Sequence, residues 1–150
     1  MGFSLPIATV ASTGLSSLKI SLPTITVAFL AAMIFGKVFH LKSHLRTLIG
    51  FGTAICGGSA IAAAAPIIEA DEEEIALSMS TIFFFNILAV FIFPVLVHEW
   101  HMSNFQFGLW SGTAINDTSS VVAAAFSYSK AAGEMATIVK LARALMIVPV

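Results

Sequence analysis

The chain has 150 residues and a formal net charge of −1, with 58% hydrophobic and 10% charged residues. An average soluble domain is about half apolar and about a quarter charged, so this composition excludes a small water-soluble enzyme and a disordered tail. It also excludes a nucleic-acid-binding protein, because no basic stripe is available to neutralise phosphates. We therefore expect a single, all-α, polytopic membrane domain.

The charged residues fall in clusters that delimit apolar runs, and a helix needs about 20 apolar residues to cross a bilayer. We predict spanning helices over residues 20–38, 47–68 and 75–97, since hydrocarbon offers no partner to a free amide. A fourth apolar region, 103–129, has one charge near its middle and is expected to be broken or re-entrant. Residues 144–150 are expected to begin a further helix that the sequence cuts off.

The charges also predict an orientation. Lys37, Lys42 and Arg46 share one short loop, which the positive-inside rule places in the cytoplasm. A full crossing by 47–68 then puts the acidic cluster that follows it outside. A re-entrant 103–129 segment would keep the next basic residues in the cytoplasm, which favours that alternative. The acidic cluster consists of Glu69, Asp71, Glu72, Glu73 and Glu74, and the basic residues are Lys130, Lys140 and Arg143.

Two stretches repeat each other at an offset of 60, because residues 52–55 and 112–115 both read Gly-Thr-Ala-Ile. Neither continues as good lipid-facing helix. The pair Gly57-Gly58 costs roughly 1 kcal/mol per glycine relative to alanine, and residues 116–120 place five polar side chains in a row. Irregular backbone is tolerated at membrane depth only beside protein or water. Paired, interrupted segments are typical of a transporter's substrate site.

A helix that breaks in mid-membrane favours an anion at its new N-terminus and a cation at its carbonyl end. Close packing of small residues explains the first stretch equally well. For the second we prefer a site, since a central charge such as Asp117 costs about 2.5–3.5 kcal/mol to insert. Asp117 is the candidate for proton coupling. The candidate substrate-binding residues are Cys56, Gly57, Gly58, Ser59, Asn116, Thr118, Ser119 and Ser120.

These two stretches resemble the YeiH-type family of bacterial inner-membrane proteins, whose members are called sulfate exporters. Lys140-x-x-Arg143 resembles a further stretch of that family. The resemblance implies that the chain is a portion of an inverted-repeat transporter of about twice this length, with helices broken near the midplane. The family usually has a histidine where Asn116 stands and often a glutamine at Ser120, so Asp117 alone remains to carry a proton.

Other motifs have simpler explanations. The His-Glu-Trp-His sequence at 98–101 lacks the i, i+4 histidine pair of a zinc helix and suits a membrane edge. No serine is paired with a recognisable base, so the sequence gives no support for hydrolytic chemistry. We expect no enzymatic activity, and no metal or cofactor. Lys140 and Arg143 share a helix face, and we prefer positive-inside anchoring over the alternative that they escort an anion.

Our hypothesis is a secondary transporter in the cell inner membrane that moves a small anion and is coupled to protons. Sulfate or a related sulfur oxyanion is implied only by the resemblance. The alternatives are a cation/proton exchanger, in which Asn116 and Asp117 bind the ion, and a non-transporting scaffold subunit. The expected partners are the lipid bilayer, a small inorganic or organic anion and protons, with a homodimer as a further option and no nucleic acid.

Overall fold

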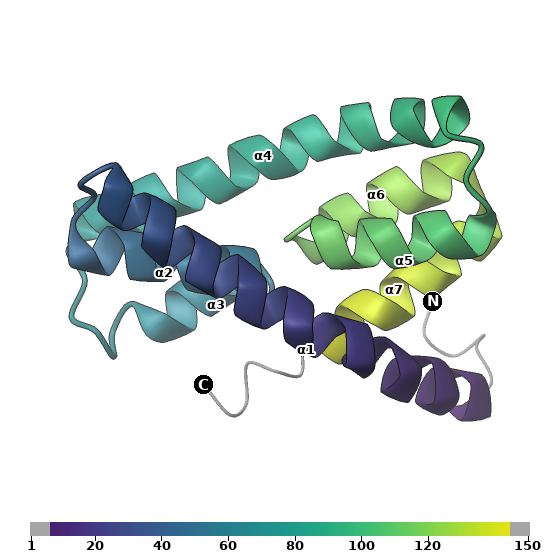
Figure 1. Ribbon diagram of the computed structural model, residues 1–150, viewed down its shortest axis with the longest axis horizontal. Helices are drawn as coiled ribbons and strands as arrows, with labels where there is room; N and C mark the ends of the chain where they lie inside the picture. The colour runs from purple at the N-terminus through teal and green to yellow at the C-terminus, as the bar shows by residue number, and fades with distance from the viewer. Residues whose placement is uncertain (1–6, 145–150) are drawn as a thin grey trace.

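The computed structural model describes residues 7–144, with side chains from residue 19 onward, and this part of the chain contains helices and no strand. The predicted all-α fold is confirmed. The predicted helix start at 144–150 lies outside the described residues, apart from Ala144. In chain order the helices are α1 (Ile7–Val38), α2 (Ser43–Ala54), α3 (Gly58–Ala64), α4 (Glu72–Glu99), α5 (Asn104–Ala114), α6 (Thr118–Tyr128) and α7 (Lys130–Ala144) (Figure 1).

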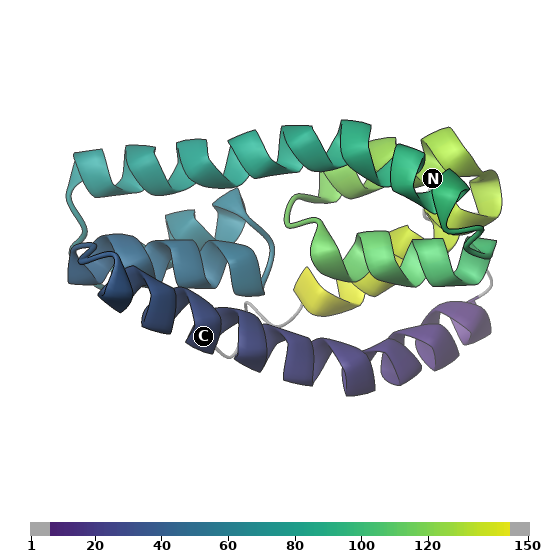
Figure 2. The same ribbon diagram turned by 45° about the horizontal axis from the view of Figure 1, so that its top comes forward.

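Two helices of the described part are long and apolar enough to cross a membrane, namely Lys19–Val38 within α1 and the whole of α4. Helix α4 begins with a capping box, in which the side chains of Asp71 and Glu74 each accept from the other's backbone N–H. Its large side chains are mostly outward-facing, Phe84 and Phe91 being 60% and 71% exposed. Helices α1 and α4 lie on opposite sides of the molecule, with the short helices between them (Figure 2).

The predicted span 47–68 is wrong, because the chain breaks in its middle. Helix α2 ends at Ala54, and α3 begins at Gly58 and returns beside α2. Gly57, between them, has a φ of +72°, a left-handed conformation that costs glycine little. A Cβ on Gly52 would lie 3.0 Å from the Cδ1 atom of Ile61, so the two arms of this α2–α3 hairpin are in close contact.

The hairpin changes the predicted orientation. The Nδ1 atom of His44, at the start of α2, lies 3.3 Å from an Oε atom of Glu74, in the first turn of α4. The basic loop and the acidic cluster therefore lie at the same end of the molecule and not on opposite sides. A count of apolar residues cannot distinguish one crossing from two shorter arms that enter and return.

A second hairpin follows α4. Helices α5 and α6 are separated by a break at residues 115–117 and return to the same end. Two long-range hydrogen bonds close that end, from the Tyr128 hydroxyl to the Met102 carbonyl at 3.0 Å and from the Ser129 hydroxyl to the Asn104 side chain at 2.8 Å. Segment 103–129 thus has the geometry of the re-entrant alternative. Because α4 crosses the molecule first, Lys130 lies at the end opposite the basic loop, contrary to the predicted orientation.

Each hairpin is preceded by one long helix, so the order long helix–hairpin occurs twice. The α2–α3 hairpin enters from one end and the α5–α6 hairpin from the other, and their tips come together in the middle (Figure 2). Helix α7 then runs beside α5 and α6 toward these tips. This arrangement makes the C-terminal ends of the two repeated Gly-Thr-Ala-Ile stretches face each other (Figure 2), although 60 residues separate them in the sequence.

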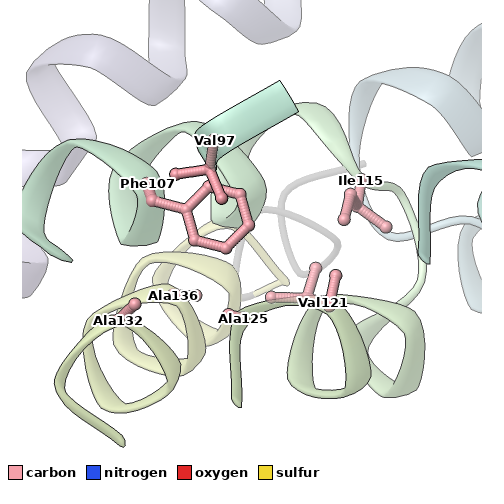
Figure 3. Packing of buried hydrophobic residues seen from close by; sticks show 8 residues of the cluster. Val97, Phe107, Ile115, Val121, Ala125, Ala132 and Ala136 are labelled. Atoms are coloured by element: carbon pink, nitrogen blue, oxygen red, sulfur yellow. The ribbon is translucent and has the colours of Figure 1, made fainter. Parts of the chain in front are cut away.

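Close packing against α5 fixes the position of α7. A Cβ added to Gly112 would lie 2.8 Å from the Ala136 carbonyl oxygen, and one added to Gly108 would lie 2.7 Å from the Met135 Cβ. These glycines form a Gly-x-x-x-Gly surface on which the α7 backbone rests. The surrounding apolar cluster comprises Val97, Phe107, Ile115, Val121, Ala124, Ala125, Ala132 and Ala136 (Figure 3).

Candidate substrate site at the hairpin tips

The predicted site residues all lie on the two hairpin tips, which the fold brings into contact. A Cβ on Gly57 would lie 3.6 Å from the backbone carbonyl carbon and oxygen of Asn116. Ser59 and Ser119, which are equivalent in the repeat, are both exposed. Cys56, Gly57 and Asn116 are buried, and Gly58, Asp117, Thr118 and Ser120 are partly buried.

The carboxylate of Asp117 caps helix α6. Its Oδ2 atom accepts a hydrogen bond from the backbone N–H of Ser120 at 3.1 Å, from the Ser119 hydroxyl at 2.6 Å and from the Ser120 hydroxyl at 3.3 Å. A negative charge at a helix N-terminus is favourable, since it satisfies free N–H groups and interacts with the helix dipole. Asp117 therefore has a structural task as well as any role in proton transfer.

Asn86, in the middle of α4, holds the second tip from outside the hairpin. Its Oδ1 atom accepts from the backbone N–H groups of Asn116 at 3.0 Å and Asp117 at 3.4 Å, and the side chain is 2% exposed. Asn86 is not among the site residues predicted from the sequence. The signal available was a lone amide in the most apolar predicted span, where a polar side chain needs a partner.

Helix α7 inserts two cations between the tips. The side chain of Lys140 is 0% exposed, and its ammonium donates to the carbonyl oxygen of Ile55 at 3.1 Å and to that of Ile115 at 3.2 Å. Each acceptor is the first residue after a broken helix. One ammonium group therefore joins the two hairpin tips.

Arg143, one turn later, makes a second bridge. Its Nε donates to the Ala54 carbonyl at 2.8 Å and its Nη2 to the Thr53 carbonyl at 2.8 Å, while its Nη1 donates to the Thr113 carbonyl. The side chain is 1% exposed. The last carbonyls of any helix lack partners within the helix, and its C-terminus carries partial negative charge. Arg143 and Lys140 supply both the donors and the compensating charge.

The preferred explanation of Lys140 and Arg143 as surface anchors is therefore wrong. From the sequence, a cation one or two turns before an apolar run is expected at the membrane surface. The broken helices, however, have buried carbonyl groups at their C-terminal ends, and these groups need a cationic donor. The acceptors are also symmetric, because Thr53 and Thr113, like Ile55 and Ile115, are equivalent at the offset of 60. Helix α7 thus binds both halves of the repeat at equivalent positions, with one additional bond to Ala54 in the first half.

The charges at the tips do not balance. Within the described residues, the ion pairs are His44–Glu74 and Lys130–Glu134, and neither includes Lys140 or Arg143. Asp117 contributes the single carboxylate on the tip segments, 55–59 and 115–120. Two cations and one carboxylate leave a formal charge of +1. In the described part of the chain, no three His, Cys, Asp or Glu side chains are grouped as a metal site would require.

Comparison with known proteins identifies the family. Residues 1–150 match the family model described as conserved hypothetical protein 698. The chain belongs to this family. The YeiH-type resemblance is thereby confirmed. Relatives similar to the chain include a UPF0324 membrane protein of Streptococcus pneumoniae serotype 4, which is 51% identical over 154 residues. UPF0324 membrane proteins of Clostridium tetani and Geobacter sulfurreducens are also similar to the chain, at 45% and 43% identity.

These alignments cover 100% of the chain but 46%, 44% and 48% of the three relatives, so the chain spans about half their length. All three relatives are named membrane proteins, in agreement with the two long apolar helices. No solved structure matches the chain.

Proposed function

We propose that this chain is part of a secondary transporter, and not of an enzyme, that carries a small anion across the cell inner membrane as a multi-pass protein. The observation that carries the proposal is the pair of fully buried cations, Lys140 and Arg143, held between two hairpin tips without an ion-pair partner among the described residues. A buried charge is costly, so its usual reason at membrane depth is a functional one.

The depth of the tips supports a transport site. Asn86, which binds the second tip, is 14 residues from Glu72 and 13 from Glu99, the ends of α4. At 1.5 Å per residue the tips lie about 20 Å from either end of α4, so an α4 that spans the bilayer would hold them near its midplane. Substrate sites of secondary transporters lie near the midplane, where discontinuous helices meet.

The hydrogen bonds favour an anion over a cation. A transported cation would need the carbonyl groups at the C-terminal ends of the broken helices. Here α2 and α5 already direct those carbonyls to Lys140 and Arg143. An ammonium has three N–H donors, and the two carbonyls use two of them, so a third remains for a ligand. The guanidinium has five, and it also keeps donors beyond its three carbonyl bonds.

The charges at the tips are also compatible with coupling of transport to protons. All three hydrogen bonds to the Asp117 carboxylate go to Oδ2, which leaves Oδ1 to receive a proton. Protonation would raise the formal charge of the tips from +1 to +2, which matches a divalent oxyanion. Sulfate or a related sulfur oxyanion is our proposed substrate, since ammonium and guanidinium donors both suit tetrahedral oxyanions.

Uptake of radioactive sulfate into proteoliposomes that contain the full-length protein tests the proposal. Lys140→Met should abolish saturable uptake, because it removes one cation and both of the hydrogen bonds that this cation donates to the tips. Lys130→Met is the matched control, since Lys130 lies on the same helix with a side chain that is 84% exposed. Sodium-dependent proton flux without anion uptake would instead support the cation exchanger. Equal uptake by Lys140→Met and wild type would contradict the proposed site.

A further inference from the structure

Only one of the two polar atoms in the Asn86 side-chain amide has hydrogen-bond partners among the described residues. Its Oδ1 accepts from two backbone N–H groups of the second tip, but its Nδ2 is buried and has no hydrogen-bond partner in the described part of the chain. The orientation of the amide is well determined, because exchanging the two atoms would direct an NH2 group at two N–H donors. Buried donors are nearly always paired in native proteins, so the missing acceptor requires an explanation.

The position of Asn86 points to the tips as the place of that acceptor. Ile82, one turn earlier on α4, would lie 3.4 Å from a Cβ on Gly57, at the first tip. Asn86 contacts residues 116 and 117, at the second tip. Residues four apart lie on one helix face, so a single face of α4 covers the place where the tips meet.

We propose that Asn86 Nδ2 donates a hydrogen bond to the transported oxyanion, so that α4 is a binding element alongside the two hairpins. This inference rests on the proposed function. A neutral donor adds a hydrogen bond without changing the charge balance that Lys140, Arg143 and Asp117 set. It also gives selectivity. Because Nδ2 can only donate, it suits any oxygen of sulfate, which carries no proton, but not the hydroxyl group of hydrogen phosphate, which needs an acceptor.

The test compares Asn86→Asp with wild type in proteoliposomes made from the full-length protein, using sulfate and inorganic phosphate as the two substrates. The new carboxylate keeps an acceptor for the backbone of the second tip but replaces the donor with a second acceptor. We expect the KM for sulfate to rise by at least about 10- to 100-fold, the effect of losing a hydrogen bond to a charged ligand, because the added negative charge also opposes the anion. We also expect the preference for sulfate over hydrogen phosphate to fall or reverse.

Ser78→Ala is the matched control. Ser78 is also buried on α4, but its hydroxyl bonds the Ile75 carbonyl of its own helix at 2.9 Å, so neither the KM nor the selectivity should change. If Asn86→Asp cannot be recovered folded, Asn86→Gln takes its place. Its amide stays neutral while the donor moves by one methylene, so the KM for sulfate should rise and the selectivity should remain.

Two results would overturn the inference while leaving the proposed function intact. One is an unchanged sulfate KM and unchanged selectivity in Asn86→Asp. The other is a loss of thermal stability in both variants with an unchanged KM, which would mean that another part of the protein accepts from Nδ2. A wild-type protein that takes up neither sulfate nor phosphate would overturn the inference and the proposed function together.

Discussion

Asp117 combines a structural role with the proposed chemical one, and the two can be separated by a single substitution. As the N-cap of α6 it needs an oxygen that accepts from Ser120, and an asparagine supplies one. Asn and Asp are about equally good N-caps, so the fold of the hairpin should not depend on the charge. The proposed proton coupling, in contrast, requires a group that can be ionised.

We therefore predict that Asp117→Asn keeps its thermal stability in detergent within a few degrees of wild type but loses the pH dependence of sulfate uptake. Uptake into proteoliposomes would be measured with and without an imposed pH gradient. Ser119→Ala is the control, since it removes one hydrogen bond to the carboxylate but retains the ionisable group. Proton-coupled uptake that persists in Asp117→Asn would show that the carboxylate is not the coupling group.

The candidate residues at the tips were predictable from sequence, but their partners were not. Gly57 and Asp117 are recognisable because glycine pairs and isolated charges are unusual inside apolar runs. Lys140 and Arg143 are equally visible as charges, yet their acceptors are main-chain carbonyls 25 to 90 residues away. Every residue has a backbone carbonyl group, so the sequence does not indicate which of them act as acceptors. The role of the two cations therefore follows only from the three-dimensional arrangement.

At the scale of elements, the contact between α5 and α7 determines whether Lys140 and Arg143 reach the tips. The Gly108 and Gly112 surface lets the helices approach so closely that α7 carbonyl and side-chain atoms occupy the space of a side chain on α5. A larger residue at either position must move α7 away from α5. Such a displacement also moves the two cations relative to the carbonyls that they bridge.

Gly112→Leu should therefore destabilise the protein by about 1–3 kcal/mol, the usual cost of overpacking, and should also lower sulfate uptake. Thermal unfolding in detergent measures the first effect and proteoliposome uptake the second. Ala131→Leu, which adds the same side chain on the exposed face of α7, should leave both unchanged. Wild-type stability of Gly112→Leu would mean that α7 does not pack against α5 as described.

The breaks inside the elements were predictable, whereas the return of the first hairpin was not. Polar and glycine-rich sequence near residues 57 and 117 marks both interruptions. The segment 47–68 contains 22 residues, enough for one crossing, and nothing in its composition distinguishes a crossing from the 12-residue and 7-residue arms that form. The direction after a break depends on Gly57 and on packing against Ile82, a contact between distant parts of the chain.

For the whole molecule, the two hairpins enter from opposite ends, and this arrangement determines which loops share a side of the membrane. The contact between His44 and Glu74 places the loops before and after the first hairpin together. Lys130 lies at the other end, beyond α4 and the second hairpin. The topology is therefore testable without any knowledge of the substrate.

We predict that Lys42→Cys and Glu73→Cys, both at exposed positions, react with a membrane-impermeant thiol reagent from the same side of the membrane. Lys130→Cys should react only from the other side. The measurement uses intact cells and inverted vesicles, in full-length protein whose native cysteines have been replaced. Labelling of positions 42 and 73 from opposite sides would contradict the α2–α3 hairpin and restore a full crossing by 47–68.

The order of the chain also has a consequence for biosynthesis. Both hairpins leave the ribosome before α7, so their C-terminal carbonyls enter the bilayer without the Lys140 and Arg143 side chains that later bind them. Until α7 arrives, water or the insertion machinery must satisfy those groups. Assembly of the tips therefore has to wait for α7, and a ribosome that stalls before residue 140 would leave an insertion intermediate whose tip carbonyls lack both cations.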